Sequence, residues 1–151
     1  MQTEKLEIGT IEMNRQKVLV VEDSKTQSVL ISRSLINKGY DVIAAFDGGE
    51  AIEKVCSELP QCIVMDIVLS KQYNGFQLCR LFKRSPLTQN IPVILLSSKQ
   101  TELDKSWGRR QGADLYLTKP CDLNHLVNTV EHFIQASTAE PLARNWAFAQ
   151  R

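Results

Sequence analysis

Four short apolar runs in this sequence each end in side chains that can do chemistry. In chain order these side chains are Glu22 with Asp23, Asp66, Ser97 and Lys119. Carboxylates, a hydroxyl and an ammonium group suit a site that binds a cation and attacks a phosphoryl group. If the runs are parallel strands, their carboxyl ends share one edge of a sheet and bring these side chains together.

Three carboxylates in one small pocket repel each other. At about 4–5 Å and an effective dielectric constant near 20, each pair costs roughly 3–4 kcal/mol. Lys119 alone does not offset several such pairs, so we expect a bound cation. The cysteines show no metal-ligand spacing, and the histidines lack neighbouring ligands. Oxygen ligands alone favour a hard ion, and without a D-x-D-x-D-G loop we expect Mg²⁺ rather than Ca²⁺.

The elements that must position these side chains follow from the spacing of apolar residues. Strands and helices alternate with short connections, which predicts an α/β fold with a five-stranded parallel sheet, doubly wound as (βα)5. The predicted strands are Lys17–Val21, Asp41–Ala45, Cys62–Asp66, Pro92–Leu96 and Asp114–Thr118. The predicted helices run from Ser24 to Gly39, Asp47 to Glu58, Phe76 to Ser85, Thr101 to Gln111 and Leu123 to Ile134.

The first predicted helix has a cap and an apolar face. Ser24 is expected to cap its N-terminus, and Gly39 to end it. Its apolar side chains are expected to point inward; these are Val29, Leu30, Ile31, Leu35 and Ile36.

Composition excludes several classes of partner. The 151 residues carry a formal net charge of +1, and 43% of them are hydrophobic, as in an ordinary globular domain. There is no basic block, and no apolar stretch approaches the roughly 20 residues of a membrane-spanning helix. We therefore expect neither nucleic acid nor membrane as a partner. The first residues lack an apolar signal core, so we expect a cytoplasmic protein.

We predict three segments: an N-terminal arm over residues 1–16, a folded domain over residues 17–136 and a C-terminal tail over residues 137–151. The tail contains Trp146 and Phe148, which are unusual in a solvated segment. Two interpretations remain open for it. The tail either packs loosely on its own domain or docks on a partner.

Six motifs are shared with a known family, and together they are highly specific. They are Val20–Ser24, Asp47–Ala51, Val64–Asp66, Pro92–Ser97, Gly112–Asp114 and Thr118–Pro120. Over about residues 17–135 the chain resembles the receiver domains of two-component response regulators, of the CheY-like single-domain type. The resemblance implies a flavodoxin-like fold, a phosphorylated aspartate and Mg²⁺ as cofactor.

The resemblance also implies roles for four residues around the metal. Asp66 matches the aspartate that accepts the phosphoryl group. Asp23 matches the direct Mg²⁺ ligand, and Glu22 matches the acid that holds a metal-bound water. The backbone carbonyl of Val68 falls at the position of the family's backbone metal ligand.

Three further residues match the family's switch. Ser97 resembles the Ser or Thr whose hydroxyl bonds to the phosphoryl group, and Lys119 resembles the lysine that stabilises it. Both would serve the reaction at Asp66 as catalytic groups. Tyr116 resembles the aromatic residue that changes rotamer on activation; the alternative is an ordinary aromatic residue of a strand.

The implied function is that of a stand-alone, phosphorylation-dependent response regulator rather than an enzyme. A histidine kinase, CheA-like or hybrid, would phosphorylate Asp66 and thereby change contacts with a downstream protein. The segment Ser106–Ala113 resembles receivers of type IV pilus chemosensory systems. This suggests control of twitching, phototactic or chemotactic motility, with a pilus motor component as a candidate target.

Two alternatives belong to other classes. The chain could be a receiver-like interaction module that works without phosphorylation. It could also be a phosphohydrolase that uses Asp66 as nucleophile. The D-x-D motif of aspartate-based phosphatases is absent, since Ile67 and Val68 follow Asp66.

The chain departs from the family pattern beside Asp66. Ser70 stands where proline is usual, the loop Ser70–Asn74 is one residue longer, and Cys121 replaces the commoner phenylalanine. Val68 and Lys99 flank the expected path of the hydrolytic water. Because the Val68 side chain has no polar group to orient water, we expect a long-lived phosphoryl group.

Overall fold

The computed structural model describes residues 15–98 and 101–138. Its five strands form one sheet in the order β2-β1-β3-β4-β5, and every strand pair is parallel. This confirms the predicted fold class. The strands are β1 (Lys17–Val21), β2 (Asp41–Ala45), β3 (Cys62–Asp66), β4 (Val93–Ser97) and β5 (Leu115–Thr118). The helices are α2 (Lys25–Asn37), α3 (Gly48–Glu58), α4 (Gly75–Arg84), α5 (Glu102–Arg110) and α6 (Leu123–Thr138).

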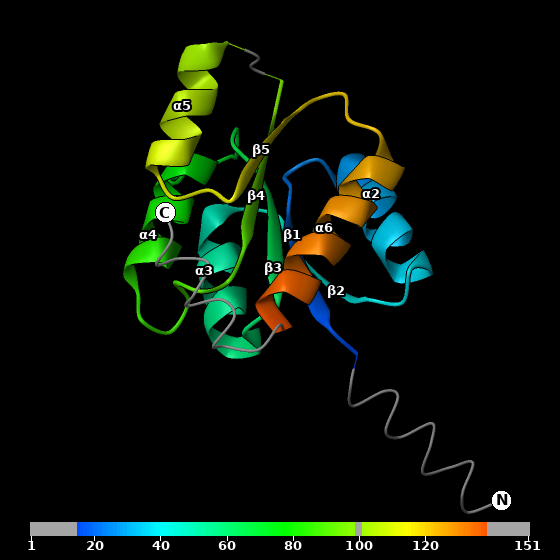
Figure 1. Ribbon diagram of the computed structural model, residues 1–151. Helices are drawn as coiled ribbons and strands as arrows, with labels where there is room; N and C mark the ends of the chain where they lie inside the picture. The colour runs from blue at the N-terminus through cyan, green and yellow to red at the C-terminus, as the bar shows by residue number, and fades with distance from the viewer. Residues whose placement is uncertain (1–14, 99–100, 139–151) are drawn as a thin grey trace, which may run out of the picture.

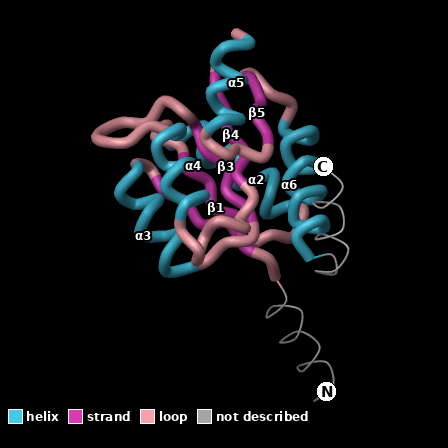
Figure 2. The backbone as a smooth tube through the Cα atoms, turned by 60° about the vertical axis from the view of Figure 1, so that its left-hand side comes forward, coloured by secondary structure: helices cyan, strands magenta, loops and turns pink. Residues whose placement is uncertain are grey.

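Helices cover both faces of the sheet, as Figures 1 and 2 show. Helices α3, α4 and α5 lie on one side, and α2 and α6 lie on the other. Among residues 15–98 and 101–138, no helix combines the length and the apolar character needed to cross a membrane.

The central strands are apolar throughout because both of their faces are buried. All five residues of β3 and all five of β4 are buried. Alternate side chains enter two separate cores. Leu19, Ile63 and Leu95 pack against the α3–α4 side, while Val20, Val64 and Ile94 pack against α2 and α6. The sheet is therefore held rigidly from both sides, and its carboxyl edge is fixed in space.

Side-chain caps determine where several helices begin. The Ser24 hydroxyl accepts a hydrogen bond from the Gln27 amide, which confirms the predicted cap of α2. The Asp47 carboxylate accepts one from the Glu50 amide at the start of α3, at 2.9 Å. Asn74 and Gln77 form a reciprocal capping box on α4.

The predicted inward face of α2 is partly wrong. Ile31 and Leu35 are buried, but Val29, Leu30 and Ile36 are 48, 51 and 54% exposed. The third buried position of the face is Ser28. Positions 28, 31 and 35 follow helical spacing, and only one such stripe can face the sheet.

Several element boundaries also differ from the predictions. Strand β4 includes Ser97, and α6 continues to Thr138. Strand β5 begins at Leu115 rather than at Asp114. The Asp114 carboxylate instead accepts hydrogen bonds from the Val93 amide at 2.7 Å and from the Lys83 ammonium at 2.8 Å. Asp114 thus ties together the starts of β4 and β5 and the end of α4.

The two faces of α2 can be compared with one substitution at two positions. Leu35→Ala should lower the free energy of unfolding by about 2–5 kcal/mol, because it leaves a cavity in the core. Leu30→Ala, on the exposed face, should cost less than about 1 kcal/mol. Urea denaturation of both variants measures the difference. Equal losses of free energy of unfolding in the two variants would contradict this placement of α2.

Candidate functional site

The strand ends bring three carboxylates together. Glu22 and Asp23 follow β1, and Asp66 is the last residue of β3, the neighbouring strand. One oxygen from each lies within 4.8 Å of the others. Glu22 and Asp66 are 2 and 8% exposed, whereas Asp23 is open to solvent. The pocket therefore concentrates negative charge at the carboxyl edge of the sheet.

Lys119 lies between two of these acids. Its ammonium nitrogen is 2.8 Å from Glu22 Oε1 and 2.9 Å from Asp66 Oδ2. It donates a third hydrogen bond, of 2.7 Å, to Gln27 Oε1. The backbone places Lys119 here because its amide donates to the Ser97 carbonyl at the end of β4. One ammonium faces three carboxylates, so two negative charges remain unbalanced.

The local environment shifts two pKa values. Burial raises the pKa of Glu22, and the nearby Asp66 charge adds to the effect, although the hydrogen bond from Lys119 opposes it. Burial lowers the pKa of Lys119, but hydrogen bonds to Glu22 and Asp66 outweigh this, and the net shift is upward. Lys119 is therefore a stable ammonium at neutral pH.

The backbone after Asp66 turns sharply. Asp66 Oδ1 accepts a hydrogen bond from the Val68 amide at 3.2 Å. The Gly75 amide donates to the Ile67 carbonyl at 2.8 Å, which closes the loop between them. A Cβ atom at Gly75 would lie 2.6 Å from the Asp66 carbonyl oxygen, so this close approach requires glycine. The sharp turn leaves the other carboxylate oxygen, Asp66 Oδ2, paired with Lys119.

The remaining predicted residues lie at the same edge or beside it. Ser97 is fully buried and is the residue after Leu96, which pairs with Asp66 in the sheet. Val68 follows β3 and is 57% exposed. Tyr116 lies further from the edge, within β5, and its ring packs toward Gly108 of α5. A Cβ atom on Gly108 would come within 2.8 Å of this ring.

Sequence reasoning missed two residues of the site. Gln27 is the third acceptor for Lys119. The available signal was its position in the first turn of α2, four residues after Asp23. Gly75 permits the close return of the chain under Asp66. The dipeptide Asn74-Gly75 indicates a turn, but the sequence does not show which part of the backbone this turn approaches.

Comparisons with known proteins identify the family. The response regulator receiver domain profile matches residues 18–131. The chain belongs to the response regulator receiver domain family. It is 40% identical to protein PilH of Pseudomonas aeruginosa over 114 residues, which covers 76% of this chain and 93% of PilH. Protein PilG of the same organism is 38% identical over 122 residues, which covers 81% of this chain and 90% of PilG.

A solved structure supports the same assignment. The chemotaxis response regulator CheY4 of Vibrio cholerae superposes with a TM-score of 0.74 at 27% identity. The superposition covers 80% of this chain and 99% of CheY4. The receiver fold predicted from the motifs is thereby confirmed.

Receiver domains typically bind Mg²⁺ at an acidic pocket, and the residues of this receiver domain fit that ion. The donors at the strand ends are carboxylate oxygens, which suit a hard cation. The two unbalanced negative charges match the charge of one divalent ion. The site is open on the side of Asp23, the exposed member of the cluster.

The raised pKa of Glu22 predicts a pH dependence of stability. The folded chain holds the Glu22 proton more tightly than the unfolded chain, so Glu22 contributes to the free energy of unfolding at low pH. It is lost as the pH rises through the folded pKa. In metal-free buffer, native protein should therefore gain free energy of unfolding relative to Glu22→Gln as the pH falls from neutral. Urea denaturation across the pH range measures this, and a constant difference would contradict it.

Proposed function

We propose that this receiver domain is a phosphorylation-dependent response regulator whose Asp66 accepts a phosphoryl group from a histidine kinase. The observation that carries the proposal is the contact between Asp66 Oδ2 and the Lys119 ammonium, inside a cluster of three acids. Without a cation, a cluster of three carboxylates resists further negative charge. With a divalent cation and Lys119 beside it, the same cluster can accept a phosphoryl group.

The proposed reaction is a transfer from nitrogen to oxygen. An Asp66 carboxylate oxygen forms a bond to phosphorus while the bond between phosphorus and the kinase histidine breaks. The histidine nitrogen keeps the electron pair and takes up a proton. Mg²⁺, when bound, neutralises phosphoryl oxygens. Asp23, Asp66 and the Val68 carbonyl would hold the ion, with Glu22 acting through a bound water.

Two side chains of this receiver would respond to the phosphoryl group on Asp66. Phosphorylation adds a charge of about −1.5 to −2. The Lys119 ammonium would turn toward it from Glu22 and Gln27, and the Ser97 hydroxyl would donate to it. Because Lys119 and Ser97 lie at the ends of β5 and β4, their movement would reach Tyr116, whose ring contacts α5. We propose that the face formed by α5, β5 and α6 changes its partner affinity in this way.

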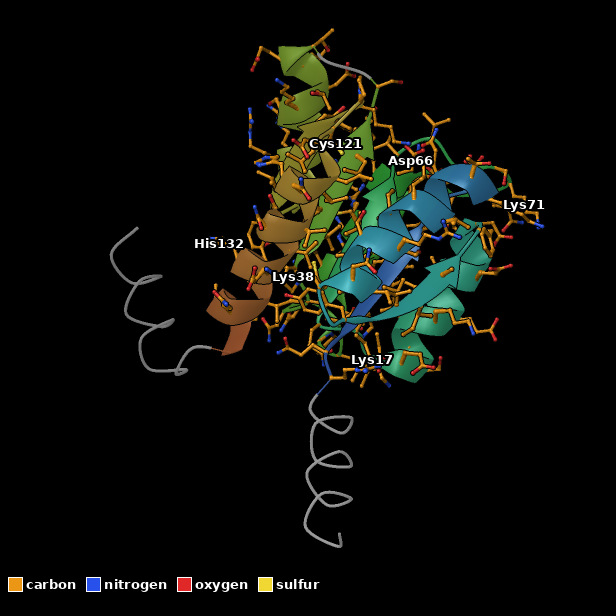
Figure 3. The ribbon with its side chains drawn as sticks, turned by 90° about the vertical axis from the view of Figure 1, so that its right-hand side faces the viewer. Lys17, Lys38, Asp66, Lys71, Cys121 and His132 are labelled. Carbon is orange, nitrogen blue, oxygen red and sulfur yellow. The ribbon has the colours of Figure 1, made fainter. Side chains whose placement is uncertain are left out.

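A kinase must dock beside Asp66, and the surface offers a groove there. A hollow of about 550 Å³ opens between α2 and the start of α6, lined by Leu30, Ile31, Cys121 and Leu123 together with Lys119. Figure 3 shows Cys121 and Asp66 at the same end of the sheet. The exposed Leu30 favours an apolar contact with the incoming kinase domain.

The identities to PilH and PilG support a more specific role. We propose that the domain acts in a chemosensory system that governs pilus-dependent motility. Its signal would pass to a protein target, such as a component of the pilus motor. Gly108, within the segment that resembles pilus-system receivers, admits the Tyr116 ring against α5.

Phosphorylation of Asp66 can be tested directly. Acetyl phosphate with Mg²⁺ should phosphorylate the native protein, and Asp66→Asn should abolish the product because it removes the nucleophile. Asp41→Asn is a matched control, since Asp41 begins β2 at the opposite end of the sheet. Intact-mass spectrometry measures the product. Equal labelling of Asp66→Asn would refute the proposal, and steady phosphate release from small phosphoesters would favour the phosphohydrolase.

The lifetime of the phosphoryl group gives a second test. Val68 is exposed, and its side chain has no group that orients water. The native phosphoprotein should therefore lose phosphate slowly. Val68→Asn should shorten the half-life severalfold by positioning a water, whereas Val68→Ala should leave it unchanged. The other flanking residue, Lys99, lies outside the described residues. Rapid loss from native protein, unaltered by Val68→Asn, would contradict this account.

A further inference from the structure

The loop between β3 and α4 contacts a third element, the start of α3. It spans residues 67–74, begins directly after Asp66 and carries the Val68 carbonyl. By the family resemblance given above, Ser70 stands where proline is usual and the loop is one residue longer. Its shape must therefore be determined by contacts elsewhere in the structure.

One anchor is an ion pair to the start of α3. Lys71 Nζ lies 3.0 Å from Asp47 Oδ2, while the other Asp47 oxygen caps α3 through the Glu50 amide. Lys71 has a φ of +71°, in the left-handed region that disfavours side chains. The backbone thus adopts an unfavourable conformation at the residue whose side chain makes the ion pair.

The second anchor is a steric contact one residue along α3. A Cβ atom at Gly48 would lie 2.7 Å from Tyr73 Cβ and 3.0 Å from its ring. Tyr73 therefore packs directly on the Gly48 backbone, which is possible only because Gly48 has no side chain. This contact is apolar and independent of the ion pair.

Both anchors connect to the acidic cluster through the sheet. Helix α3 follows β2, whose last residue, Ala45, accepts a hydrogen bond of 3.0 Å from the Glu22 amide. At its other end the loop is closed by the Gly75 amide on Ile67. The Val68 carbonyl therefore lies on a segment that is held at both ends, and each end connects to an acid of the cluster. Figure 3 shows Lys71 at the same end of the sheet as Asp66, with Lys17 at the opposite end.

We propose that Asp47, Gly48, Lys71 and Tyr73 form a loop clamp that positions the Val68 carbonyl for the divalent cation. These four are positioning residues, since they act through Val68 and need not touch the ion. The inference rests on the proposed metal-dependent phosphorylation of Asp66. It adds that metal affinity in this protein depends on contacts with α3.

Magnesium affinity of the intact protein tests the clamp without any phosphodonor. Isothermal titration with MgCl₂ should show binding weakened about two- to fivefold in Lys71→Gln, the range expected for an exposed ion pair. The direction of the change in Mg²⁺ affinity is informative. If Lys71 acted only through its charge, removing a cation would strengthen Mg²⁺ binding. Lys71→Arg, which keeps the ion pair, should bind as the native protein does.

Matched controls separate the clamp from general effects. Gly48→Ala should weaken binding without any change of charge, whereas Gly49→Ala should not, because its Cβ would have only an ordinary contact of 3.4 Å. Lys17→Gln breaks a comparable ion pair, 2.9 Å from Glu58, and should leave Mg²⁺ affinity unchanged. Urea denaturation verifies that each variant is folded. If Gly48→Ala does not fold, Tyr73→Ala replaces it.

The outcomes distinguish this inference from the function on which it rests. Weaker binding in Lys71→Gln and in the Gly48 or Tyr73 variant, with native affinity in the controls, supports the clamp. Unchanged or tighter binding in Lys71→Gln overturns the clamp and leaves the proposed function standing. If the native protein itself does not bind Mg²⁺, both the loop clamp and the proposed function are overturned.

Discussion

The contact of a single ammonium group with two buried carboxylates is the interaction on which this structure depends. Glu22 and Asp66 lie at the carboxyl ends of the adjacent strands β1 and β3, which are largely buried. Each acid pair would repel by roughly 3–4 kcal/mol, and Lys119 reduces but does not cancel this repulsion. The remaining negative charge makes the site receptive to a divalent ion. In the proposed function, the same lysine would contact the phosphoryl group on Asp66.

The two hydrophobic cores make this electrostatic arrangement possible. Buried charged groups normally lower stability unless their partners are held in good geometry. Here the partners are fixed by strands whose side chains are packed on both faces, so the carboxylates cannot separate to relieve their repulsion. The apolar packing therefore maintains a polar site that would otherwise relax.

The strand ends were predictable because a parallel sheet places them together whatever their separation in sequence. Lys119 and Glu22 were accordingly expected to meet. The outward orientation of Leu30 and Ile36 was not predicted, because apolar residues cover more of α2 than one face, and only packing selects the stripe. The Gln27 contact was missed for a related reason. A polar residue in a first helical turn usually faces water, and the sequence does not show that the Lys119 side chain, just after β5, reaches the start of α2.

The order in which the site is assembled along the chain has a consequence for protein synthesis. Lys119 contacts Glu22 across 97 residues of sequence and Asp66 across 53. A nascent chain that has not yet released β5 from the ribosome presents acids without their ammonium partner. Such a chain lacks the group that would stabilise a transferred phosphoryl. The complete cluster of acids and ammonium therefore forms only after the last strand has been synthesised.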